Sequence, residues 1–128
     1  MEQTTYVTKL LNAFHYLILI FPIIIYLFPK ICFKNSIKYI LLFYILIPLH
    51  WVFINNMCLT TYISINLGDY KNSKTTSQFS ENNLMWLYTP LLQLFGWKFD
   101  NDGMDKITTL HSFINILFIW YYCFYIKN

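Results

Sequence analysis

The sequence contains no arginine and few charged residues of any kind. All nine basic residues are lysines, and 12% of the 128 residues are charged, whereas soluble domains average about 25%. The net charge of +3 is small and scattered, which excludes nucleic acid as a partner because nucleic-acid binding requires a basic face. Together with the abundance of Asn, Ile, Phe and Tyr, the lysine-only basic set indicates an AT-rich coding genome.

Glycine and cysteine are also scarce. Three glycines in the whole chain do not form the glycine-rich loop that binds phosphates. The cysteines, Cys32, Cys58 and Cys123, are odd in number and far apart, so no pair has metal-ligand or redox spacing. Their simplest role is that of small buried apolar residues. No acidic residue falls within a predicted span, so no carboxylate pair is available there for catalysis, and the sequence favours a protein that is not an enzyme.

Apolar residues dominate what remains. The chain is 57% hydrophobic and 21% aromatic, which is more than a soluble domain of this size could bury. We therefore predict an all-α, polytopic membrane helix bundle that forms a single domain over residues 1–128. Four helices are favoured, at about 13–28 (extendable back to Tyr6), 37–54, 84–97 and 107–126.

The third predicted span, residues 84–97, is the ambiguous one. Its 14 residues give about 21 Å of helix, which is short for a hydrocarbon core of about 30 Å. Pro90 lies in its middle, and its tryptophans and tyrosine are types that favour the membrane interface. A re-entrant arm or an interfacial helix are the alternatives to a span.

Loops and tails set the predicted orientation. The short connector Lys30–Lys38 carries three lysines, which by the positive-inside rule puts it on the cytoplasmic side or its equivalent. Residues 68–83 are predicted to form a polar loop with little internal order, after which Ser80 or Asn82 caps the next helix. Asp102 or Asp105 is predicted to cap the last helix.

Three histidines fall within predicted spans: His15, His50 and His111. An ionisable group in lipid is costly and usually faces the bundle interior, which makes each a candidate functional residue. The simplest interpretation is a hydrogen bond from each imidazole to a carbonyl or hydroxyl group of a neighbouring helix. His15 and His50 are predicted to lie on the side away from the lysine connector, and His111 joins them only if residues 84–97 do not cross.

Polar residues concentrate at residues 49–61, where the second apolar run ends. The helical pattern persists through Leu67, and on a continuous helix His50, Ile54, Cys58 and Thr61 share one face. His50 and Cys58 would then be about 12 Å apart along the axis, too far for a nucleophile pair. The candidate intramembrane polar site comprises His15, His50, Asn55, Cys58, Thr60, Thr61 and His111.

The layout resembles a family of small, uncharacterised four-span membrane proteins. The matching features are His15 early in the first span, Cys58-Leu59-Thr60 in place of a Cys-Pro-Leu-Thr motif after the second, and Tyr88-Thr89-Pro90 in the third. Small membrane proteins of giant DNA viruses are also similar, through His50-Trp51, Asn55 or Asn56, and Cys58-Leu59-Thr60-Thr61. The resemblance implies four helices and no established activity.

The sequence favours a non-enzymatic component of a cellular, organellar or viral membrane. Its partners would be the lipid bilayer and either further copies of itself or other membrane proteins. One alternative is a redox or ligand-binding membrane protein that uses His15 and His50, with haem or a quinone. A second is a small channel or transporter whose oligomers line a path with His50, Asn55 and Thr61. No metal site is predicted, and no cofactor is expected beyond the haem alternative.

Overall fold

The computed structural model describes residues 5–54, 57–71 and 73–125, and all secondary structure within these ranges is helical. The fold class is therefore all-α, as predicted. Two segments are long and apolar enough to cross a membrane, Tyr6–Leu27 and Asn101–Phe124. The helices in chain order are α1 (Tyr6–Ile24), η1 (Ile25–Leu27), η2 (Lys30–Phe33), α2 (Ile37–Phe53), α3 (Leu59–Asn66), α4 (Gln78–Asn83), α5 (Met85–Phe95) and α6 (Asn101–Phe124).

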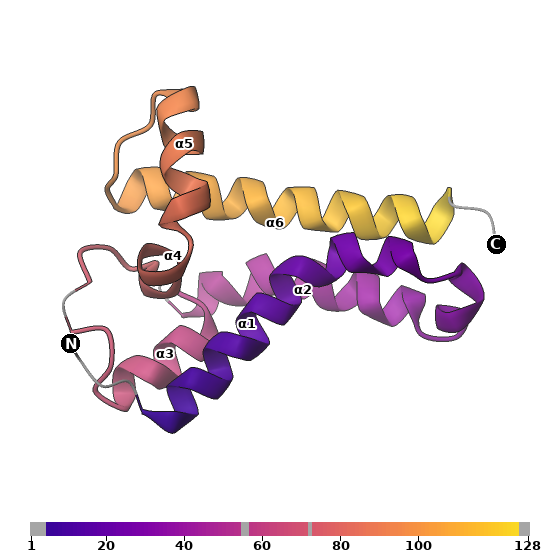
Figure 1. Cartoon of the computed structure of the whole chain (residues 1–128), viewed down its shortest axis with the longest axis horizontal. Coiled ribbons are helices and arrows are strands. Elements are labelled where there is room, and N and C mark those ends of the chain that lie inside the picture. The colour runs from indigo at the N-terminus through magenta and orange to yellow at the C-terminus, as the bar shows by residue number, and fades with distance from the viewer. Residues whose placement is uncertain (1–4, 55–56, 72, 126–128) are drawn as a thin grey trace.

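Three helices run along the long axis of the molecule (Figure 1). α1 and α6 run in one direction and α2 returns in the other, so the Lys30–Lys38 connector and the end of α6 lie at the same end. The short helices α3, α4 and α5 gather at the opposite end, and α5 points away from the long axis. We call this second region, the described residues between 57 and 100, the cap.

The core of the three long helices lies toward the connector end. Ile25, Ile37, Ile119 and Tyr122 are almost fully buried there. The Tyr122 hydroxyl donates a hydrogen bond of 2.6 Å to the carbonyl of Phe28, which satisfies a polar group that burial would otherwise penalise. Of the cysteines, Cys123 is buried in this core as expected, whereas Cys32 is exposed on η2.

A second core joins the cap to α6. Its buried members come from α4, α5, the residue between them and the first turns of α6: Phe79, Leu84, Tyr88, Leu92, Met104 and Ile107. Leu84, Tyr88 and Leu92 are spaced four apart, so they share one face of α5. α5 is therefore held by a packed apolar face against α6.

The structure does not confirm residues 84–97 as a fourth span. α5 contains 11 residues, which rise about 16 Å, half the thickness of a hydrocarbon core of about 30 Å. Gly96 ends the helix with a left-handed conformation, φ +69°, a backbone state that glycine adopts without steric cost. The chain then turns back toward the start of α6, and α5 does not continue as a longer helix.

The second apolar run does not continue as one helix through Leu67. α2 ends at Phe53, where the amide of Ile54 bonds to the carbonyl of Trp51 in a tighter turn. A separate helix, α3, starts at Leu59, whose amide donates to the side chain of His50 at 3.2 Å. The shared helical face predicted for His50, Cys58 and Thr61 is therefore wrong.

The polar segment 68–83 is more ordered than predicted. Its last six residues form α4, and the Glu81 carboxylate accepts hydrogen bonds from the amide of Lys74 at 2.8 Å and from the amide and hydroxyl of Thr75 at 2.9 and 2.8 Å. Ser80 and Asn82 lie inside α4, and no side chain caps α5. The predicted caps were wrong because a short helix replaces the expected loop.

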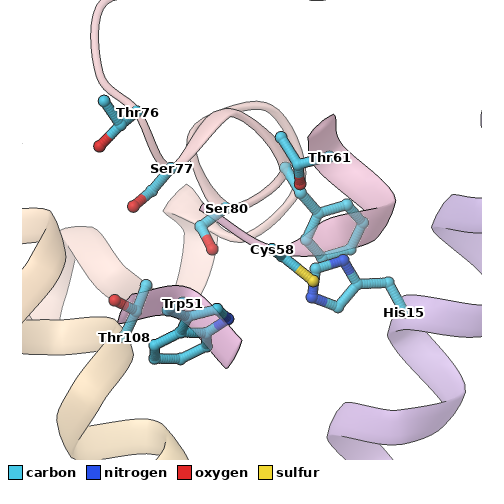
Figure 2. Close-up of a pocket in the computed structure, with 9 residues that line it drawn as sticks. His15, Trp51, Cys58, Thr61, Thr76, Ser77, Ser80 and Thr108 are labelled. Carbon is cyan, nitrogen blue, oxygen red and sulfur yellow. The ribbon is translucent and has the colours of Figure 1, made fainter. Parts of the chain in front are cut away.

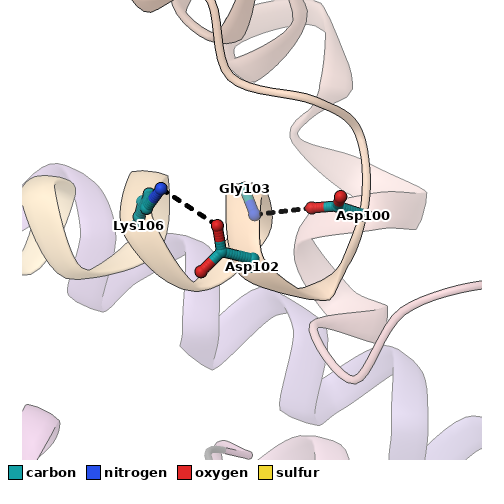
Figure 3. Close-up of polar contacts among 4 residues, drawn as sticks. All are labelled: Asp100, Asp102, Gly103 and Lys106. Atoms are coloured by element: carbon teal, nitrogen blue, oxygen red, sulfur yellow. Dashed lines mark hydrogen bonds and ion pairs between the residues drawn. The ribbon is translucent and has the colours of Figure 1, made fainter.

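α6 begins at Asn101, before the predicted residue 107, and its cap is Asp100. The Asp100 carboxylate accepts a hydrogen bond from the amide of Gly103 at 2.8 Å (Figure 3). Asp102, one of the two predicted caps, instead pairs with Lys106 at 2.9 Å on the exposed side of the first turn. Residues 101–106 of the linker are helical, which adds about 1.7 turns to the start of the helix.

Replacing Asp100 with alanine is expected to lower the free energy of unfolding by about 1 kcal/mol, because the first turn of α6 loses its side-chain acceptor. Asp102→Ala is the matched control, since an exposed ion pair contributes about 0.5 kcal/mol or less. Thermal unfolding in detergent, followed by circular dichroism, measures both. Equal losses for the two variants would contradict the assignment of Asp100 as the cap.

Candidate functional site

His15 of α1 lies at the junction between the long helices and the cap. Its ring stacks on Phe79 of α4, with centroids 3.8 Å apart and planes 14° from parallel. Its Nδ1 is 3.3 Å from the hydroxyl of Thr60, and that hydroxyl is 3.2 Å from the Cys58 sulfur. A hydrogen-bonded chain of thiol, hydroxyl and imidazole therefore connects the start of α3 to α1.

His50 occupies the last turn of α2. Its Nε2 accepts the amide hydrogen of Leu59, which places the ring proton of the neutral imidazole on Nδ1. The hydrogen-bond partner of Cys58 is Thr60 and not His50. Asn55, which was also predicted for this site, lies outside the described residues.

His111 of α6 pairs with the cap through Tyr88. The Tyr88 hydroxyl lies 2.7 Å from His111 Nδ1, and the two rings meet edge to face with centroids 5.8 Å apart. His15 and His111 thus each form a hydrogen bond with a hydroxyl group of a neighbouring helix. This is the simplest role that the sequence predicts for a histidine in an apolar span. Sequence reasoning missed Tyr88, although its four-residue spacing from Leu84 and Leu92 marks the buried face of α5.

His15 lines a cavity with each of the other two histidines. His15 and His111 line one cavity of about 50 Å³, and His15 and His50 line a larger groove of about 380 Å³. The membrane sides predicted for the three histidines stay predictions. In the described part of the chain, no three His, Cys, Asp or Glu residues gather as a metal site would require.

A small polar cavity of about 40 Å³ adjoins His15 on the cap side (Figure 2). The indole nitrogen of Trp51 is buried beside it and has no hydrogen-bond partner among the described residues. A buried water needs roughly 10–15 Å³ of such space and two to four polar partners, so the cavity has room for one. Its hydroxyl, thiol and imidazole lining consists of His15, Cys58, Thr61, Thr76, Ser77, Ser80 and Thr108.

Thr61 belongs to the interior of a single chain. It is 4% exposed and faces this cavity, so it is not on a surface that a neighbouring copy could contact. A path lined by His50, Asn55 and Thr61 between subunits would require α3 to turn. Haem or quinone binding at His15 and His50 stays a prediction.

Comparison with known protein families, curated proteins and solved structures finds no match for this chain. Function therefore has to be argued from the geometry, and the resemblance to small four-span membrane proteins stays a prediction. Three features of the geometry bear on function: the apolar outer surface of α1, α2 and α6, the polar cluster around His15, and the groove that joins His15 to His50.

Proposed function

We propose that the protein is an integral membrane protein in which α1, α2 and α6 cross the bilayer and the cap lies at one membrane face. The supporting observation is the surface of these helices. Large apolar side chains stand 39–86% exposed along α1, α2 and α6, among them Leu17, Ile23, Val52, Phe53 and Leu117. Monomeric soluble proteins rarely expose apolar patches beyond a few hundred Å².

Helix length agrees with this arrangement. Tyr6–Leu27 has 22 residues and α6 has 24, or about 33 and 36 Å. α2 has 17 residues, the lower limit for a span of about 17–25 residues. With three crossings, the Lys30–Lys38 connector lies on the cytoplasmic-equivalent side and the cap on the other, where α5 rests at the interface.

Cysteine accessibility is expected to give the same side for both ends of α5. Single-cysteine variants are made at Lys74 and Lys98, which are exposed before and after α4 and α5, and the native Cys32 of η2 serves as the opposite-side reference. A membrane-impermeant maleimide should label positions 74 and 98 in intact vesicles and Cys32 only after permeabilisation. In vesicles of the opposite orientation, it should label Cys32 first and positions 74 and 98 only after permeabilisation. Labelling of 74 and 98 from opposite sides would contradict the proposal and restore the fourth span.

We further propose that the molecular role is non-enzymatic and depends on assembly of copies of the chain in the membrane. The outer face of α6 supports this role, because it carries Leu117, Phe118, Trp120 and Tyr121 around an open depression of about 470 Å³. Aromatic side chains are enriched at protein interfaces, where they bury a large area at small entropic cost.

Cysteine substituted for Leu117 is therefore expected to form disulfide-linked dimers in the membrane when the native cysteines are replaced by alanine. Leu42→Cys, an equally apolar and half-exposed position on α2, is the matched control and should stay monomeric. Dimers are measured on non-reducing gels after mild oxidation. Equal cross-linking at both positions, or at neither, would contradict assembly through α6.

A further inference from the structure

We propose that a long-chain fatty acid binds between α1 and α2, with its carboxyl group at His50 and its alkyl chain extending toward Tyr39. This ligand site is independent of assembly through α6, because the two surfaces share no residue. The site consists of two adjoining apolar cavities, together called the groove, with imidazole, thiol and hydroxyl groups at the His50 end and the hydroxyls of Ser36 and Tyr39 at the other end.

The groove exists because α1 and α2 pack on other elements more than on each other. α2 packs chiefly on α6, and α1 packs on α3 and α6. Two cavities of about 380 and 350 Å³ separate α1 from α2, and both are lined by Phe14, Ile18 and Phe43. Each lies within the range of about 300–1,000 Å³ that is typical of ligand pockets.

The length and walls of the groove suit an alkyl chain. Tyr39 and His50 are 11 residues apart on α2, or about 16 Å along the helix. The walls between them are the apolar side chains of Phe14, Ile18, Phe43 and Leu46. In the proposed bilayer, lipid chains have direct access to such an opening.

The polar end of the groove suits a carboxyl group. His15, His50, Cys58 and Thr60 come together there from three helices or helix ends, and none of the described residues that line the groove is acidic. Because His50 Nε2 accepts the Leu59 amide hydrogen, its Nδ1 carries the proton and can donate it to a carboxylate oxygen. The imidazole donor therefore suits an acceptor head group at the His50 end, and this sets the proposed direction of the chain.

A pair of photoreactive fatty acids tests the position and the direction of binding. The purified protein is placed in lipid nanodiscs and irradiated with a fatty acid that carries a diazirine either next to the carboxyl group or near the terminal methyl group. Mass spectrometry should find the first probe on His50, Ile54 or residues 58–60 and the second on residues 14–21 or 39–43. The same labelling pattern from both probes would overturn the proposed direction.

Matched variants and competitors test the two parts of the groove. His50→Ala should weaken oleate competition about tenfold, the effect of one lost hydrogen bond to a charged group, while His111→Ala, which lies outside the groove, should not. Leu46→Trp should block labelling, whereas Leu42→Trp on the same helix should leave it intact. Each variant is first checked for unchanged helicity by circular dichroism.

In the wild type, oleate should compete with the photoreactive probe at least tenfold better than methyl oleate does. In His50→Ala, the two compounds should compete equally well. Equal competition in the wild type would overturn the assignment of the carboxyl group to His50. No competition by either compound would overturn the site itself. If Leu46→Trp instead dissociated an oligomer and the wild type bound no fatty acid, the groove would be an interface between copies and the proposal would fail.

Discussion

Replacing Gly103 with alanine is expected to destabilise the protein by about 3 kcal/mol, the upper end of the usual cost of overpacking a close contact. A Cβ atom at this position would lie 1.8 Å from the carbonyl oxygen of Lys98 and 3.0 Å from its carbonyl carbon. Both are backbone atoms, so no side-chain rotation relieves the clash. The linker between α5 and α6 would have to move away from the first turn of α6.

The linker carries several contacts that this movement would break. The carbonyl of Lys98 accepts the amide hydrogen of Asp100 at 3.0 Å, and Asp100 caps α6 through the amide of Gly103 (Figure 3). Trp97 packs against the second core and lies under the Lys106 ammonium, 5.8 Å from the ring centroid. One added methyl group would therefore disturb three features together: the Asp100 cap of α6, the linker, and the packing of α5 against α6.

Gly96→Ala is the matched control for this prediction. Gly96 has a φ of +69° but open space around its Cβ position, so alanine there incurs only the left-handed backbone cost of about 1–2 kcal/mol. Thermal unfolding in detergent, followed by circular dichroism, gives the comparison. A Gly103→Ala variant no less stable than Gly96→Ala would show that the linker does not press on α6.

Replacing Asp69 with asparagine is expected to release the start of α1 from the cap and to lower stability by about 2 kcal/mol at pH 7, as for hydrogen bonds to a charged group. Asp69 follows α3 and is 8% exposed. Its carboxylate accepts hydrogen bonds from the hydroxyls of Thr8 and Thr5 and from the amide of Thr5. Asparagine offers one acceptor oxygen and no charge.

The same carboxylate predicts a loss of stability in acid. The Thr8 hydroxyl above all, and then the hydroxyl and amide of Thr5, hold the pKa of Asp69 below its ordinary value of 3.8, although burial acts in the opposite direction. A depressed pKa in the folded state means that the contribution is full above the unfolded pKa of 3.8 and declines as the pH falls through the folded pKa. The contribution of Asp69 to stability should therefore be constant from pH 7 to about 5 and fall below about 4.

Melting temperatures of the wild type and the Asp69→Asn variant between pH 7 and pH 3 test this expectation. The difference between the two proteins should be largest at pH 7 and should shrink below about pH 4, where the wild-type carboxylate takes up its proton. Asp102→Asn, in an exposed pair with Lys106, is the control and should change stability by about 0.5 kcal/mol or less. A constant gap between wild type and Asp69→Asn down to pH 3 would count against the role of the Asp69 charge.

The sequence by itself determined the helical class and the approximate position of every long helix. Apolar runs of adequate length, bounded by Lys30 and Lys38, mark α1 and α2 without reference to any tertiary contact, because a helix satisfies its own backbone hydrogen bonds. Composition also determined that these helices have more apolar surface than the chain can bury. Three histidines inside apolar segments were similarly visible as residues that require a polar partner.

Only the tertiary structure decided where the helices stop and which polar groups meet. The break between α2 and α3 depends on the hydrogen bond from the Leu59 amide to His50. The Asp100 cap of α6 depends on how the linker folds back. The local sequence pattern determines neither of them. The partners Thr60 for His15 and Tyr88 for His111 are 45 and 23 residues distant in sequence. The first contact follows from the packing of α3 against α1. The second follows from packing α5 against α6, since burial of Leu84, Tyr88 and Leu92 fixes the orientation of α5 and so places the Tyr88 hydroxyl on His111.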